Sequence, residues 1–71
     1  MDDVRERLAH NLLSQRERAG LSQERLGELC GLDRTEISLL ERGKRFPRLD
    51  TLVRVSRALQ LKPADLLDGI Q

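Results

Sequence analysis

The apolar residues at the start of this 71-residue chain recur at the spacing of a helix. Val4, Leu8 and Leu12 stand four residues apart, which places them on one face of a helix expected over residues 3–19. Gly20 follows and is expected to end that helix. Most apolar residues of the chain are leucine and Phe46 is its single aromatic residue, a composition that suits a helical core better than a β-sheet.

A second helix is predicted over residues 22–30. Ser22 is a suitable N-cap residue, and Gly31 is expected to end the helix in the left-handed conformation. The residues expected on its buried face are Leu26, Leu29 and Cys30. Gly27 is unusual in a helix interior, where glycine costs about 1 kcal/mol relative to alanine. We therefore expect a neighbouring backbone to approach closely at Gly27.

A third helix is predicted over residues 33–42, directly after a tight turn. Asp33 and Glu36 have the spacing of a capping box at its start. The residues expected to face inward are Ile37, Leu40 and Glu41, which leaves an outer side made of Arg34, Thr35, Ser38 and Arg42. Gly43 is expected to end this helix.

Two more helices are predicted over residues 49–60 and 63–68, the second opening on Pro63 in the favoured first position. The chain contains no internal repeat, low-complexity stretch or linker. Its length suffices for one small domain. The pattern therefore predicts an all-α, compact, five-helix fold in a single domain over residues 1–71.

Positive charge is concentrated in one part of the chain. The net charge is only +1. Residues 42–57 nevertheless carry six positive side chains against the single acid Asp50, a local balance of +5 that leaves −4 for the rest. Such asymmetry is typical of a surface that binds nucleic acid. A solvated turn is the plainer interpretation of its most basic part, residues 42–48.

The titratable residues offer no catalytic or metal-binding arrangement. Cys30 is the single cysteine and His10 the single histidine, so no intrachain disulfide, metal site or cofactor site is expected. No catalytic motif is present, and the chain is not predicted to be an enzyme. Cys30 is interpreted as a small buried apolar residue, with a redox switch as the alternative.

Membrane association is not expected either. No apolar run approaches the roughly 18 residues of a membrane span, and the start of the chain does not have the pattern of a signal peptide. The expected location is the cytoplasm.

Several short motifs stand in a fixed order from residue 20 onward. They are G-L-S-Q at 20–23, L-G at 26–27, G-L at 31–32, D-R-T-E-I-S-L-L-E-R-G at 33–43 and L-x-x-L-x-x-V-S-x-A-L at 49–59. With these motifs, residues 12–70 resemble the helix-turn-helix domain of the Cro/C1 repressor family, also called XRE-like. The resemblance implies a lambda-repressor-like DNA-binding fold. The run L-D-R-T-x-I-S, followed by E-R, is also similar to the controller proteins of restriction–modification systems.

The resemblance implies contacts with double-stranded DNA. Residues expected to read base edges are Arg34, Thr35, Leu39 and Arg45, and those expected to hold phosphates are Gln23, Ser38, Lys44, Arg48 and Thr51. Arginine offers two donors to the O6 and N7 atoms of guanine. Leu39 would contact a thymine methyl group or pack at the groove edge. The alternative is that Arg34 and Thr35 are ordinary solvent-facing residues of a surface helix.

Two further sets of residues have structural roles in this interpretation. The resemblance implies an ion pair between Arg16 and Glu41 beneath the DNA-binding motif. The last helix carries more apolar residues than a short element needs to bury. A homodimer interface is therefore expected at Val53, Leu66, Leu67 and Ile70.

These features together predict a sequence-specific transcriptional regulator, a repressor, an activator or both, that binds an inverted-repeat operator as a dimer. Autoregulation and control of a restriction–modification system are the narrower expectations. The alternative is a DNA-binding antitoxin whose main role is to neutralise a partner toxin. No small-molecule ligand is expected.

Overall fold

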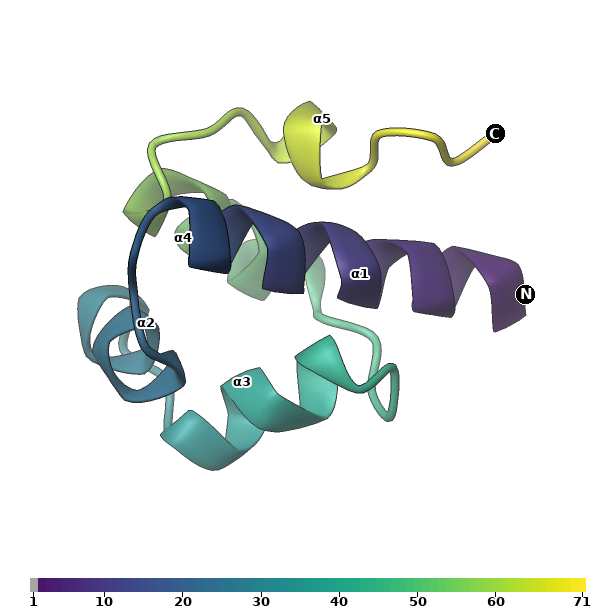
Figure 1. The fold of residues 1–71 in the computed structure, drawn as a ribbon. Helices are drawn as coiled ribbons and strands as arrows, with labels where there is room; N and C mark the ends of the chain where they lie inside the picture. Colours follow the sequence, from purple (N-terminus) through teal and green to yellow (C-terminus); the bar gives the residue numbers. More distant parts are fainter. Residues whose placement is uncertain (1) are drawn as a thin grey trace.

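The computed structural model describes residues 2–71, with side chains from Val4 onward, as five helices. They are α1 (Asp2–Arg18), α2 (Gln23–Cys30), α3 (Arg34–Glu41), α4 (Leu49–Ala58) and α5 (Pro63–Leu66). Helices α2 and α3 lie on one side of α1, whereas α5 and the C-terminal segment lie on the other (Figure 1). The predicted all-α, five-helix fold is confirmed, although α4 and α5 each end two residues earlier than expected.

All five helices contribute to one core. Its buried apolar residues are Leu8, Ala9, Leu12, Leu26, Cys30, Ile37, Leu40, Val55, Leu59 and Leu66. Leu66 is only 1% exposed and packs inside the chain, so its expected place in a dimer interface is wrong. Leu66 is the buried residue of the short helix α5, and it closes the core where α5 meets α1 and α4.

Leu29 was expected on the buried face of α2, and this prediction is wrong because the residue is 46% exposed. The buried residues of α2 are Leu26, Gly27 and Cys30. At 3.6 residues per turn, Leu29 lies roughly 100° from the centre of that face. This angle places Leu29 at the margin of the face that packs on the core, which Leu26, Gly27 and Cys30 occupy.

The turn between α2 and α3 depends on two glycines. Gly31 ends α2 in the left-handed conformation, with φ of 74°, as predicted. Gly27 lies where the backbone after the turn folds back onto α2. A Cβ atom there would lie 2.5 Å from the carbonyl oxygen of Leu32. The backbone N–H of Leu32 donates a hydrogen bond to the carbonyl of Gly27. The close approach predicted at Gly27 is therefore present.

Only half of the predicted capping box is formed at the start of α3. The carboxylate of Asp33 accepts a hydrogen bond of 2.9 Å from the N–H of Thr35, and this bond lowers the pKa of Asp33. Glu36 does not reach back to Asp33. Its carboxylate forms an ion pair with Arg45 instead, because the loop after α3 brings that guanidinium within reach.

The C-terminal segment is tied to α1 by polar contacts. The side chain of Asn11 donates two hydrogen bonds of 2.9 Å, to the carbonyl groups of Leu66 and Asp68. Asp65 caps α5 by accepting a hydrogen bond of 2.9 Å from the N–H of Lys62. These contacts hold a four-residue helix that could not form alone.

A buried network of charged and polar groups joins α1, α2 and α3. Arg16 binds both carboxylate oxygens of Glu41, with its Nε 2.6 Å and its Nη2 3.0 Å away. Its Nη1 donates to the carbonyl of Leu21 at 2.7 Å, and the amide of Gln23 donates to Glu41 at 2.9 Å. The side chains of Arg16 and Glu41 are only 12% and 3% exposed. The hydrogen bond with Glu41 raises the pKa of Arg16, so the guanidinium stays charged.

Substitution of Glu41 by alanine should unfold the domain. The change leaves Arg16 buried without its counter-ion, which typically costs about 3–5 kcal/mol. A domain of this size has a net stability of only roughly 3–5 kcal/mol. Urea unfolding followed by circular dichroism measures the loss. The matched control is Glu28→Ala, which removes an exposed ion pair with Arg25 and should change stability by less than about 1 kcal/mol. A fully stable Glu41→Ala variant would contradict the role assigned to this network.

Candidate nucleic-acid interface

The outer side of α3 carries the residues predicted to read bases. Arg34 and Thr35 are exposed in its first turn, and Ser38 and Leu39 are half-buried further along. Ile37 and Leu40 face the core and hold the helix in place. The first turn of α3 therefore presents an arginine and a threonine to the surroundings on a rigidly packed element.

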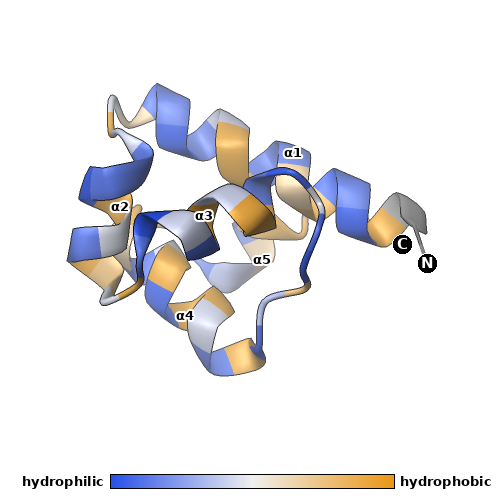
Figure 2. Ribbon diagram, turned by 90° about the horizontal axis from the view of Figure 1, so that it is seen from below, coloured by the Kyte–Doolittle hydropathy of each residue, from blue (hydrophilic) through white to orange (hydrophobic). Residues whose placement is uncertain are grey.

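The loop after α3 adds a row of positive side chains beside this helix. Arg42, Lys44, Arg45 and Arg48 are all exposed. Figure 2 shows the loop as a hydrophilic stretch that leaves the end of α3 and runs to the start of α4. Arg48 has a partner in Asp50 at 3.3 Å, but both side chains are more than half exposed. Surface ion pairs of this kind are weak, so Arg48 remains available to an anion.

Phe46 fixes the same loop to the first helix. The guanidinium carbon of Arg5 lies 5.1 Å from the centre of the Phe46 ring, a cation–π contact. This contact was not predicted from the sequence, since Arg5 and Phe46 are far apart along the chain. It orients the basic loop relative to α1.

Two residues predicted to bind phosphates, Thr51 and Gln23, are less exposed than that role requires. Thr51 is only 7% exposed, so its expected role as a surface phosphate contact is wrong; α4 turns this residue towards the interior. Gln23 is half-buried and already donates to Glu41. Its amide therefore supports the network beneath α3. Leu49, by contrast, is 76% exposed next to the basic loop and was not singled out from the sequence.

The residues predicted for a dimer interface do not all reach the surface. Leu67 is 40% exposed, Val53 and Ile70 are half-buried, and Leu66 belongs to the core. Helix α5 lies across α1 from α3 (Figure 1). A molecule bound at α3 would therefore leave the surface around α5 free for a second contact.

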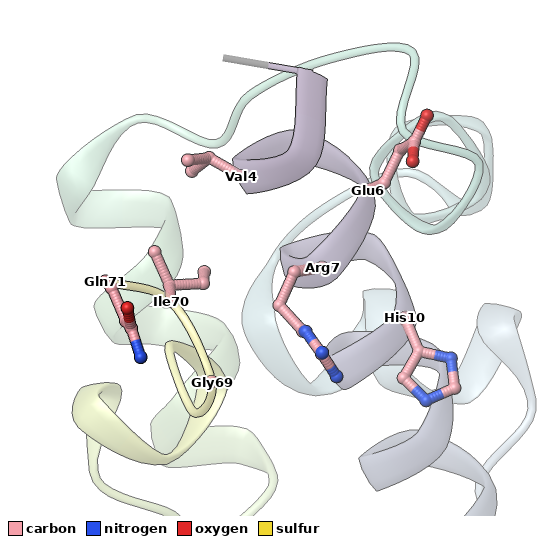
Figure 3. Close-up of a pocket in the computed structure, with 7 residues that line it drawn as sticks. All are labelled: Val4, Glu6, Arg7, His10, Gly69, Ile70 and Gln71. Atoms are coloured by element: carbon pink, nitrogen blue, oxygen red, sulfur yellow. The ribbon is translucent and has the colours of Figure 1, made fainter.

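An open hollow of about 660 Å³ lies between α1 and the C-terminal segment (Figure 3). Val4, Glu6, Arg7 and His10 line it from α1, and the remaining lining comes from Gly69, Ile70 and Gln71. Among the side chains that the structure describes, from Val4 onward, no group of three histidine, cysteine or acidic residues is arranged to hold a metal ion.

Cys30 is buried, and its thiol donates to the carbonyl of Leu26 at 3.1 Å. Burial raises the pKa of Cys30, which keeps the thiol protonated and unreactive. This environment supports the interpretation of Cys30 as a small apolar core residue. None of the described helices is both long and apolar enough to cross a membrane.

Comparison with known proteins places this arrangement in a family. A model of the helix-turn-helix family matches residues 12–66. Control protein C.BamHI of Bacillus amyloliquefaciens is 47% identical over 51 residues, which are 72% of this chain and 63% of that protein. Control protein C.SmaI of Serratia marcescens is 43% identical over 65 residues, 92% of this chain and 77% of that protein.

Solved structures agree with these sequence matches. The restriction–modification controller protein C.AhdI from Aeromonas hydrophila superposes with a TM-score of 0.87 at 35% identity, covering 93% of this chain and 98% of that one. The P22 c2 repressor, solved in complex with a synthetic operator, gives a TM-score of 0.81 at 31% identity, covering 87% of this chain and 94% of that one. The chain belongs to the helix-turn-helix family of Cro/C1-type transcriptional regulators.

Proposed function

We propose that this regulator binds a specific inverted-repeat operator as a homodimer and controls a restriction–modification system, including its own gene. The observation that carries the proposal is the pair of exposed residues Arg34 and Thr35 at the start of α3, flanked by a basic loop. The similarity to control proteins over 92% of the chain supports the narrower role and favours it over an antitoxin.

Base recognition is assigned to the first half of α3. Arg34 donates two hydrogen bonds to O6 and N7 of a guanine, and Thr35 offers a hydroxyl and a methyl group to the adjacent base pair. Leu39 contacts a thymine methyl group, and Arg45 reaches the same region from the loop. These contacts make the first turn of α3 the source of sequence preference.

Most of the affinity comes from phosphate contacts. The phosphate contacts are assigned to Ser38, Lys44 and Arg48, of which Lys44 and Arg48 are exposed and Ser38 is half-buried. Each phosphate neutralised contributes roughly −0.9 to the slope of log K against log salt concentration. Binding to any DNA should therefore weaken steeply as salt is added, while the preference for the operator persists.

Dimerisation matches the expected geometry of the operator. Two reading helices must lie about 34–36 Å apart to enter successive turns of the major groove. The chain measures 30 × 22 × 21 Å, so two copies have to lie side by side on the DNA. The exposed side chain of Leu67, with the half-buried Val53 and Ile70, supplies the apolar surface for that contact.

Substitution of Arg34 by alanine should cost about 1–3 kcal/mol of binding free energy on the operator and relax the preference at one guanine. Lys44→Ala is the matched comparison. It should weaken binding to every duplex alike and reduce the salt slope by roughly 0.9, because it removes a phosphate contact only. Fluorescence anisotropy on operator variants separates the two effects. Identical behaviour of the two variants would show that Arg34 does not read a base.

Substitution of Leu67 by aspartate should convert the dimer to a monomer and weaken operator binding. The change places a charge in the apolar surface proposed to be covered in the dimer. Sedimentation equilibrium measures the association, and circular dichroism verifies the fold. Leu29→Asp, at a similarly exposed leucine on α2, is the control and should leave the dimer intact. A wild-type protein that stays monomeric at all accessible concentrations and binds DNA as a monomer would overturn the dimer proposal.

A further inference from the structure

The ion pair between Glu36 and Arg45 links the two parts of the candidate interface. Nη1 of Arg45 lies 2.5 Å from Oε1 of Glu36. Glu36 directly follows Thr35 in the first turn of α3, whereas Arg45 belongs to the basic loop, nine residues later. The pair therefore holds a loop arginine at the reading end of α3.

Its surroundings distinguish this pair from the other surface pairs among the described side chains. The side chain of Glu36 is 25% exposed. Both partners in the pairs Arg25–Glu28 and Arg48–Asp50 are more than half exposed and lie within three residues of each other. Arg45 also lines a small cavity at the edge of the core, beside Leu40 and Leu52. The charged end of Arg45 is thus held by Glu36, while the side chain as a whole stays 55% exposed.

A carboxylate at this position has two effects on DNA binding. It repels the phosphates of any duplex that approaches α3, and it occupies Arg45, which otherwise could bind an arbitrary phosphate. It also keeps the guanidinium at Glu36, in the first turn of α3 that is proposed to read bases. Repulsion and the occupation of Arg45 weaken binding to all DNA, whereas the positioning of its guanidinium favours only a duplex that fits.

We propose that Glu36 is a specificity-determining residue that acts through Arg45. By holding Arg45 against the first turn of α3, it lowers the affinity for arbitrary DNA more than the affinity for the operator. This inference rests on the proposed function and adds a negatively charged residue to the set that reads DNA. Exposed ion pairs of this kind typically change an equilibrium by about 1.5- to 5-fold, which sets the size of the effect.

The test compares wild type with Glu36→Gln, which keeps the shape of the side chain and removes its charge. Fluorescence anisotropy measures binding to a duplex from upstream of this protein's gene and to a scrambled duplex of the same length and composition. In Glu36→Gln, the affinity for the scrambled duplex should rise, and the ratio of the two affinities should fall by about 1.5- to 5-fold. Glu28→Gln, which removes the charge from an exposed pair on α2, should leave the ratio unchanged.

A second background tests whether Glu36 acts through Arg45. With Arg45→Gln already present, Glu36→Gln should shift the affinity for both duplexes alike and leave their ratio unchanged. The inference is overturned if the ratio of the two affinities is unchanged or increased in Glu36→Gln alone. It is also overturned if Glu36→Gln lowers this ratio equally in the wild-type and the Arg45→Gln backgrounds. If the wild-type protein does not discriminate between the duplexes, both the proposed function and the inference are wrong. Normal discrimination in wild type, retained in Glu36→Gln, removes the inference alone.

Discussion

The buried contact of Arg16 with Glu41 is the interaction on which the rest of the structure depends. It joins α1 to the end of α3, and the hydrogen bonds to Leu21 and from Gln23 add the start of α2. A small helical core of leucines is permissive about the angle at which its helices pack. Fixed donors and acceptors at 2.6–3.0 Å are not, so they define the position of α3 relative to the other helices. The buried network around Arg16 and Glu41 therefore sets the position of the α3 surface proposed to face DNA.

This arrangement separates stability from recognition. Ile37, Leu40 and Glu41 face inward from α3, while Arg34 and Thr35 face outward from the same helix. Arg34 and Thr35, which are proposed to read bases, can therefore change without disturbing the core. The basic loop is held separately, by the contact of Arg5 with Phe46 and by the pair of Arg45 with Glu36. Helix α5 lies across α1, away from both, and Leu67 directly after it is exposed.

The sequence predicted the features that depend on neighbouring residues. Apolar spacing located the helices, and Ser22 and Gly31 marked the two ends of α2. The predictions failed where distant residues decide the outcome. Leu66 is buried because α5 packs over α1. Glu36 does not form the predicted capping box because its carboxylate pairs with Arg45 of the loop. The Arg16–Glu41 pair, 25 residues apart, was expected only through resemblance to a family, since no local pattern indicates it.

The most direct test of this account is the preference for one DNA sequence. Fluorescence anisotropy would compare the duplex from upstream of this protein's own gene with a scrambled duplex across a salt series. We expect tight binding to the native duplex and a large preference that survives at high salt, because base contacts do not depend on counterion release. Equal binding to both duplexes, lost in parallel as salt rises, would contradict the account and leave α3 and its loop as a surface that recognises charge alone.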